Sequence, residues 1–289
     1  ITVDGSAPAA PAVTAITTDT GINNDQITSD TTLVFSGTAE ANATVEVFID
    51  AASIGTASAD GSGNWSYDHT SATLNAGSYS VTATAQDLAG NTSATSSVLN
   101  VEVDTVAPSA PAISAITDDT NTASDGITND NQLVISGTAE ANATVEVFID
   151  VASIGTASAD GSGNWSYDHT GIALSDGSYS LTAVATDTSG NASATSSVFS
   201  LVVDTAIPTV SSYSPLNGAT DVAFNSNLSL TFANAVYVAS GSVVIRRYLD
   251  DAIIETIDIA SGQVTGSGSS SVTINPSSNL IGGRQYYVE

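Results

Sequence analysis

The feature that most constrains this chain is an internal repeat. Residues 36–70 recur as residues 136–170 with a single difference, Ala51 in the first copy and Val151 in the second. The offset of 100 holds without a gap from residue 4 to residue 203. Self-similarity over a whole domain length indicates tandem copies of one folding unit. We therefore divide the chain into two near-identical repeats and a divergent third domain: residues 1–103, 104–203 and 204–289.

Each repeat has the residue pattern of short β-strands. Val45, Val47 and Ile49 occupy alternate positions, the period of two that is typical of a half-buried strand. Turn sequences rich in Asp, Gly, Ser and Asn, such as residues 60–64, bound these runs. About seven short strands in roughly 100 residues predict an immunoglobulin-like sandwich. We expect an all-β chain of tandem immunoglobulin-like β-sandwiches arranged end to end.

The third domain follows a different pattern, but it also reads as a sandwich. Strands are expected at residues 228–232, 243–248, 253–259, 272–274 and 285–288, with a Gly/Ser loop at 265–271. Glu289 falls within an expected strand, and residues 1–3 read as the end of one. We therefore expect an internal fragment of a longer protein, with a third domain that is truncated at its C-terminus.

Charge excludes several classes of function. The chain has 30 acidic and 3 basic residues, a formal charge of −27, and no cysteine. Such a surface repels phosphate, which argues against nucleic-acid binding, and it repels anionic membranes. No disulfide and no thiolate site can form. All three basic residues lie in the third domain, so the carboxylates of the two repeats have no cationic side chain of their own repeat to pair with.

Five motifs of the second repeat occur in an order and at a spacing that are specific to one family. They are Ser-Gly-Thr-Ala-Glu (136–140), Ala-Asp-Gly-Ser-Gly-Asn-Trp (159–165), Gly-Ser-Tyr-Ser-Leu-Thr-Ala (177–183), Ala-Thr-Asp-Thr-Ser-Gly-Asn (185–191) and Val-Asp-Thr (203–205). Together they resemble the bacterial Ig-like repeats of giant surface adhesins, the biofilm-associated and type I-secreted RTX adhesins. The third domain, with its Pro-x-x-Gly-Ala-x-Asp-Val opening at 215–222, resembles the Ig-like domain of S-layer and adhesin proteins.

The resemblance implies a function for the whole segment. Members of this family are extracellular proteins, either on the bacterial cell surface or secreted. They form calcium-rigidified stalks that hold an adhesive tip away from the cell. It therefore implies an extracellular segment whose partners are the neighbouring Ig-like repeats of the same chain. A glycan or protein ligand would then belong to the parent adhesin.

The acidic residues are expected to gather at the two ends of each sandwich. Strand order places the loop after the first strand (residues 18–30 and 118–130, the A–B loop) at one end. It places the loop after the strand ending at Gln86 or Thr186 (residues 87–91 and 187–191, the F–G loop) at the other. Stacked repeats would bring acidic ends together, where bare charges repel by about 4 kcal/mol at 4 Å and an effective dielectric near 20. Calcium, which takes 6–8 oxygen ligands, is the predicted bridge. The candidate ligands are Asp104, Asp204, Glu140, Asp187, Asp87, Glu40, Asp19, Asp25, Asp119 and Asp125.

Other interpretations stay open at this point. The acidic loops could be merely solvated, and the stretch from Asp119 to Asp130 lacks the ligand spacing of an EF-hand. Trp65 and Trp165 are interpreted as core residues, with sugar stacking as the alternative. His69 and His169 are expected on the surface.

No catalytic motif is present, so we do not expect an enzyme. Two classes of function remain. The first class is a structural extender. The second is a sugar- or protein-binding module that uses the aromatic and basic residues of the third domain: Tyr237, Tyr248, Tyr286, Tyr287, Arg246, Arg247 and Arg284.

Overall fold

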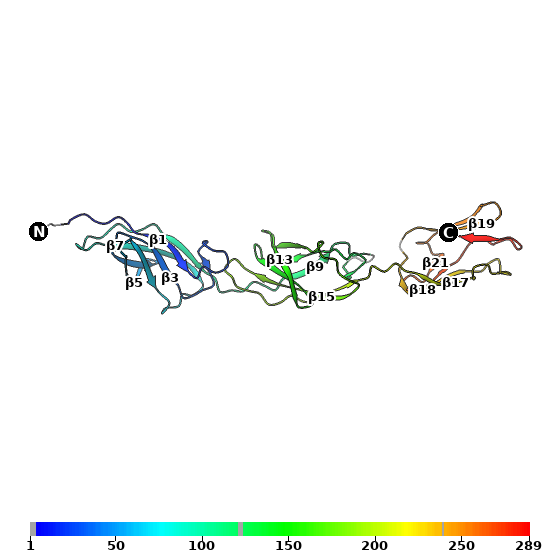
Figure 1. Cartoon of the computed structure of the whole chain (residues 1–289), viewed down its shortest axis with the longest axis horizontal. Coiled ribbons are helices and arrows are strands. Elements are labelled where there is room, and N and C mark those ends of the chain that lie inside the picture. The colour runs from blue at the N-terminus through cyan, green and yellow to red at the C-terminus, as the bar shows by residue number, and fades with distance from the viewer. Residues whose placement is uncertain (1–3, 121–123, 239) are drawn as a thin grey trace. The chain divides into compact units, whose positions relative to one another are not determined.

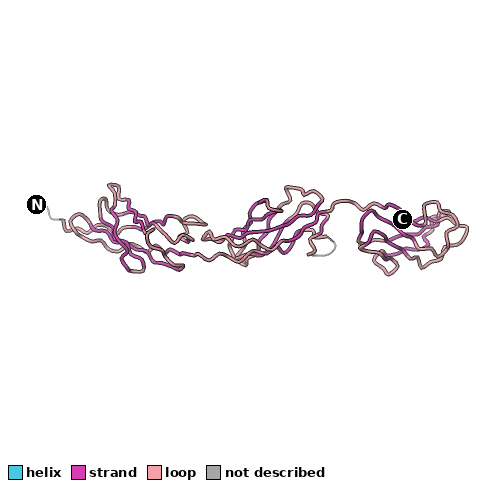
Figure 2. Tube along the Cα trace, turned by 90° about the horizontal axis from the view of Figure 1, so that it is seen from below, coloured by secondary structure: helices cyan, strands magenta, loops and turns pink. Residues whose placement is uncertain are grey.

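A computed structural model describes residues 4–120, 124–238 and 240–289. Strands, turns and loops make up this described part of the chain, which contains no helix (Figures 1 and 2). None of its elements is therefore a helix long and apolar enough to cross a membrane. By their contacts, the residues form two compact units: Ile1–Thr117 with Gln132–Val202, and Asp118–Asn131 with Val203–Glu289.

The first repeat is a sandwich of two sheets. One sheet has the order β1 (Ala12–Thr17), β3 (Val34–Thr38) and β6 (Asn64–Asp68). The other has the order β2 (Ile27–Thr28), β8 (Leu99–Val103), β7 (Gly77–Gln86), β4 (Thr44–Ile49) and β5 (Ala52–Ser58). Strand β2 pairs parallel to β8, whereas the other pairs are antiparallel. This arrangement confirms the predicted immunoglobulin-like fold.

The second repeat reproduces this arrangement strand for strand. One sheet has the order β9 (Ala112–Ile116), β11 (Val134–Thr138) and β14 (Asn164–Asp168). In the other, the successive strands β16 (Phe199–Val203), β15 (Gly177–Thr186), β12 (Thr144–Ile149) and β13 (Ala152–Ser158) follow the order of their counterparts. Val147 faces Ala183 in the ladder just as Val47 faces Ala83. The internal repeat of the sequence is therefore a repeat of the fold.

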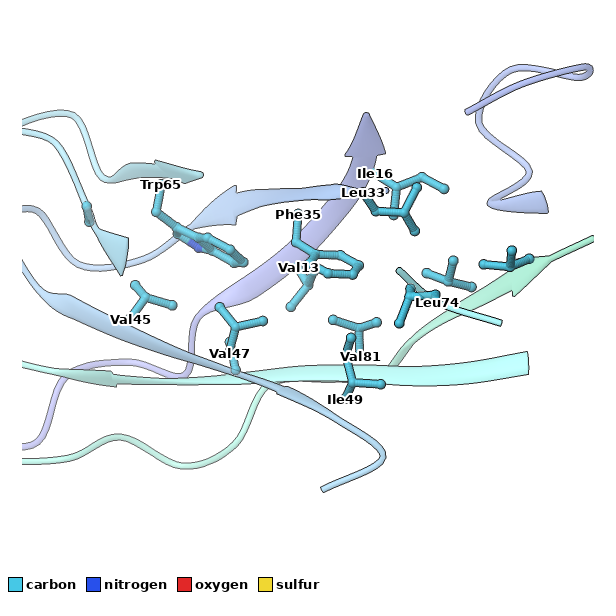
Figure 3. Packing of buried hydrophobic residues seen from close by; sticks show 14 residues of the cluster. Val13, Ile16, Leu33, Phe35, Val45, Val47, Ile49, Trp65, Leu74 and Val81 are labelled. Atoms are coloured by element: carbon cyan, nitrogen blue, oxygen red, sulfur yellow. The ribbon is translucent and has the colours of Figure 1, made fainter. Parts of the chain in front are cut away.

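The core of the first repeat lies between its two sheets. Figure 3 shows Trp65 and Phe35 from one sheet directed toward Val47 and Val81 from the other, and all four are buried. Trp65 therefore packs in the core as predicted, and the alternate strand positions face inward. Gly37 makes room for the indole, because a Cβ there would lie 2.9 Å from Trp65 Cζ2 and 1.9 Å from the carbonyl oxygen of Ala12.

The third domain has two sheets and a smaller core. One sheet has the order β17 (Val210–Ser214), β18 (Leu228–Val236), β22 (Ser269–Ile274) and β21 (Val264–Thr265). The other has the order β20 (Ile253–Asp258), β19 (Ser242–Arg247) and β23 (Tyr286–Val288). The buried cluster consists of Ile245, Ile257 and Ile274. The expected Gly/Ser loop at 265–271 is partly wrong, because β22 begins at Ser269 and pairs with β18 through Ser271.

The expectation for the two histidines is also wrong. His169 is only 5% exposed, and His69 is half-buried. The backbone N–H of His69 donates to the carbonyl oxygen of Leu33 over 3.0 Å, which holds the residue against the sheet after β6 ends. Its ring then lies 6.2 Å from Phe35 and 6.1 Å from Tyr67. A polar turn sequence did not reveal this aromatic neighbourhood.

Candidate functional site

The F–G loop of the second repeat is a turn built around one carboxylate. Asp187 Oδ1 accepts hydrogen bonds from Asn191 N over 2.8 Å and from the Ser189 hydroxyl over 2.7 Å. Asp187 Oδ2 accepts a hydrogen bond from Asn191 Nδ2 over 3.0 Å. Burial alone would raise the pKa of Asp187, but the hydrogen bonds from Ser189 and Asn191 outweigh it and hold the pKa below its ordinary value. The side chain is therefore a carboxylate anion near neutral pH.

Asp104 joins this turn. Asn191 Nδ2 donates to the carbonyl oxygen of Asp104 over 2.9 Å, and the Ser189 hydroxyl lies 3.2 Å from Asp104 Oδ2. A hydroxyl carries one proton, so Ser189 satisfies either Asp104 or Asp187 at a given moment but not both. The two carboxylates therefore share one neutral donor and have acceptor capacity left over for a cation.

The first repeat contains the same turn in simpler form. Asn91 Nδ2 donates to Asp87 Oδ2 over 2.8 Å and to the carbonyl oxygen of Asp4 over 3.2 Å. The hydrogen bond from the Asn91 side chain holds the pKa of Asp87 below its ordinary value. Ala89 occupies the position of Ser189, so no hydroxyl bridges the carboxylates. Asp87 Oδ1 instead accepts hydrogen bonds from the backbone N–H groups of Ala89 and Asn91, both over 2.8 Å.

The A–B loop of the first repeat holds oxygen atoms that lack a donor. Asp19 Oδ2 accepts a hydrogen bond from Asn24 N over 2.7 Å, and Asp25 Oδ1 accepts one from Ile27 N over 3.0 Å. Asp19 Oδ1 and Gln26 Oε1, however, are buried without any hydrogen-bond partner. Buried polar atoms are nearly always paired, so these two acceptors call for a donor or a cation.

The second repeat shows the same feature in its own A–B loop. Asp119 Oδ2 accepts a hydrogen bond from Ser124 N over 2.6 Å, while Asp119 Oδ1 is buried without a partner. Asp125 Oδ1 accepts a hydrogen bond from Ile127 N over 2.9 Å. The orphaned carboxylate oxygen therefore recurs at equivalent positions of the two repeats.

The A–B loop of the first repeat touches the F–G loop of the second. Ser29 N donates to the carbonyl oxygen of Ser189 over 3.1 Å, and the Thr20 hydroxyl donates to the same oxygen. Ile22 N donates to the carbonyl oxygen of Thr188 over 3.1 Å. The predicted meeting of these two acidic loops is thereby confirmed for the first pair of repeats.

Three of the predicted ligands stand apart from these contacts. The carboxylates of Glu40 and Glu140 are exposed, and each residue's carbonyl oxygen closes a turn to Ala43 or Ala143. Asp204 is exposed, and its backbone N–H donates over 2.9 Å to the carbonyl oxygen of Thr128 in β10 (Ile127–Thr128). Within the described ranges, no group of three or more His, Cys, Asp or Glu side chains is arranged to hold a metal ion. Any cation there would need amide, hydroxyl or carbonyl oxygens as well as carboxylates.

Comparison with known sequences now assigns the family. The sequence model of a bacterial Ig-like domain matches residues 7–105 and 107–205, and a second bacterial Ig-like model matches residues 204–289. The chain belongs to the bacterial Ig-like domain family. Its three Ig-like domains therefore account for nearly all of the sequence.

Solved structures show a looser likeness to these Ig-like domains. The fibronectin(III)-like modules of Clostridium thermocellum CbhA are 18% identical with a TM-score of 0.40, over 66% of this chain and 94% of that one. A 1.5-MDa bacterial ice-binding adhesin is 16% identical with a TM-score of 0.38, over 91% and 88%. The tetra-tandem repeat in the extending region of a large adhesion protein is 21% identical with a TM-score of 0.29, over 96% and 73%. No curated protein matches the chain.

The third Ig-like domain does not offer its first two arginines to a ligand. Arg246 lies 2.9 Å from Glu289 and 3.6 Å from Asp251, and Arg247 binds Asp250 through both Nε and Nη2. The side-chain hydrogen bonds to these acids raise the pKa of both arginines. On the surface that the sequence suggested for ligand binding, these two arginines are therefore already paired with carboxylates of the same domain.

The residues that connect the Ig-like loops were not predicted from the sequence. Ser189, Thr20 and Thr28 are neutral, so an argument from charge passed over them. The Thr28 hydroxyl donates to the carbonyl oxygen of Thr18 over 2.6 Å, and the Thr28 carbonyl accepts from Asp104 N over 2.9 Å. One signal was present in the sequence, because Ser189 stands where the first repeat has Ala89.

Proposed function

We propose that this chain is a calcium-rigidified extender segment of a large bacterial cell-surface adhesin. Its role would be reach: tandem Ig-like domains project an adhesive tip for attachment to cells or surfaces and for biofilm formation. The segment would be extracellular and non-catalytic. The observation that carries the proposal is the contact between two acidic loops in repeats that contain no basic residue.

Calcium is the cation that suits these loops. Their free acceptors are carboxylate, amide and backbone oxygens, which are the ligands that calcium prefers. At the first pair of repeats, the residues that would hold it are Asp19, Gln26, Asp104 and Asp187. Asp119, Asp125 and Asp204 would serve the same purpose on the C-terminal side of the second repeat. A bound ion would neutralise carboxylates that otherwise repel one another.

Titration of the full chain with calcium tests this proposal. Isothermal calorimetry should detect binding, and the melting temperature should rise with calcium, because a ligand that binds only the folded state stabilises it by mass action. Asp19→Asn combined with Asp187→Asn should weaken binding. Asp60→Asn is the matched control, because Asp60 only closes a turn through Ser62 N and Asn64 N. Equal melting temperatures with calcium and with chelator would rule the proposal out.

The alternative is a ligand-binding role for the third domain, alone or beside the extender role. The exposed rings of Tyr237 and Tyr248 favour it, because exposed aromatic side chains are typical of sugar and protein contacts. A glycan array probed with the full chain would separate the two. Binding that is lost in the Tyr237→Ala and Tyr248→Ala variants would assign the ligand to this domain.

A further inference from the structure

The contact between the two repeats joins residues that differ from one repeat to the other. Their bodies, residues 36–70 and 136–170, differ at one position. The touching loops diverge: Gly21 corresponds to Asn121, which lies outside the described residues, and Thr188 and Ser189 correspond to Leu88 and Ala89. Each side of the contact therefore has a loop sequence that the other repeat lacks.

Gly21 is required for the approach of the two backbones. It adopts φ of 72°, and a Cβ at this position would lie 2.0 Å from the carbonyl oxygen of Thr188 and 2.8 Å from Gly190 N. Both of these contacts are to backbone atoms, which cannot swing away. Any side chain at position 21 must therefore push the F–G loop off the A–B loop and break the hydrogen bonds from Ile22 N and Ser29 N.

Ser189 fixes the conformation of the F–G loop on the other side of the contact. It is fully buried, and its hydroxyl accepts a hydrogen bond from Asn191 Nδ2 over 2.9 Å while lying within hydrogen-bond distance of Asp187 and Asp104. These bonds fix the turn that presents the carbonyl oxygens of Thr188 and Ser189. The counterpart loop has Ala89, which cannot make them, and Leu88, whose side chain is 90% exposed.

We propose that Gly21 and Ser189 are the residues that dock the first repeat on the second without a metal. An A–B loop with glycine accepts an F–G loop with serine, through contacts between protein groups alone. A side chain at position 21 would push the two loops apart, and loss of the Ser189 hydroxyl would loosen the turn that presents the acceptors. This proposal does not rest on calcium, because none of the contacts that carry it passes through a metal.

Hydrogen exchange on the full chain, in excess chelator, tests it directly. Each of two variants places the residue of one repeat into the other: Gly21→Asn and Ser189→Ala. Asparagine tolerates a positive φ, so Gly21→Asn adds the side chain with little backbone strain. The matched controls are Gly61→Asn, where the space is open, and Ser162→Ala, an exposed turn residue whose backbone N–H makes the turn bond.

The expected result is local. In both variants the protection of the Ile22 and Ser29 amides should fall about tenfold or more, because their acceptors withdraw. The amide of Ala83, which bonds to Ser96 inside the first repeat, should keep its protection. Both controls should match the unmodified chain. Unchanged protection of Ile22 and Ser29 in Gly21→Asn would overturn the proposal.

If Gly21→Asn also destabilises the first repeat itself, hydrogen exchange alone does not separate that effect from loss of the contact. A distance measurement does. The chain contains no cysteine, so spin labels can be placed at exposed Ala52 and Ala152 alone. The unmodified chain in chelator should give one narrow distance distribution, and Ser189→Ala should broaden it. A broad distribution in chelator that narrows only with calcium would overturn this proposal while supporting the calcium proposal, so the two fail separately.

Discussion

At the scale of single residues, small differences in volume and hydrogen bonding decide the structure. Trp65 and Trp165 could be assigned to the core from the sequence, because a repeated aromatic residue on a strand pattern favours burial. The need for Gly37 and Gly137 against the indoles could not be predicted, because no sequence rule says which strand faces the indole. Glu255 was likewise not singled out, because its partners Gln263, Ser277 and Ser278 lie in later loops.

Gly137→Ala should destabilise the second repeat strongly. The new Cβ would lie 1.9 Å from the carbonyl oxygen of Ala112 and 2.7 Å from Trp165 Cζ2, so the strand or the indole must move. We expect a loss of about 1–3 kcal/mol or more in the free energy of unfolding, the range of overpacked cores. Urea denaturation followed by tryptophan fluorescence measures it. Gly161→Ala, in open space, should cost far less, and equal losses would contradict this view of the core.

Glu255 should make the third domain sensitive to acid. Burial alone would raise its pKa, but hydrogen bonds from Ser277, Gln263 and Ser278 lower the pKa from 4.5 to about 2. The folded-state pKa is depressed, so the stabilisation is complete above pH 4.5 and is lost as the pH falls toward 2. An NMR titration of the Glu255 carboxyl should give a midpoint near 2. A midpoint near the ordinary value would show that these hydrogen bonds do not persist in solution.

At the scale of elements, the strands could be predicted well because the alternation of apolar residues follows directly from the pleat. The Gly/Ser loop of the third domain was predicted too long, since a serine-rich strand lacks that alternation and is held by its ladder with β18. The contact of the A–B and F–G loops followed from strand order. Its chemistry did not, because it depends on neutral hydroxyls and backbone carbonyls that carry no charge signal.

Strand β5 is tied to β6 by one tyrosine hydroxyl. Tyr67 donates to the carbonyl oxygen of Ile54, and Tyr167 makes the same bond to Ile154 in the second repeat. Tyr67→Phe and Tyr167→Phe should each cost about 1 kcal/mol in the free energy of unfolding, the usual value of one hydrogen bond. Urea denaturation of the two variants measures the losses. Tyr237→Phe, on an exposed ring, should cost nothing measurable, and clearly unequal losses in the two repeats would contradict their structural equivalence.

At the scale of the whole molecule, one chain contains Ig-like domains whose buried clusters differ in size. The first repeat buries a broad cluster that includes Phe35, Val45 and Trp65, whereas the cluster of the third domain has three buried members. Buried apolar area is the main source of folding free energy, so stability should differ accordingly.

The third domain should therefore unfold first on heating. Scanning calorimetry should show an early transition of small enthalpy followed by the unfolding of the two repeats, because the enthalpy scales with the size of the folding unit. Amide exchange at Ile257, measured below the first transition, should be faster than at Val47. A single transition with equal protection at both residues would contradict this order.

Calcium is proposed to stiffen this chain for a role in reach, and small-angle X-ray scattering of the full chain tests that proposal most directly. With millimolar calcium we predict a stiff particle with a longest dimension on the order of 120 Å, from about 40 Å per sandwich. With excess chelator it should become shorter and more flexible, mainly on the C-terminal side of residue 203, because the contact through Gly21 and Ser189 persists. Identical scattering curves under the two conditions would contradict the proposal.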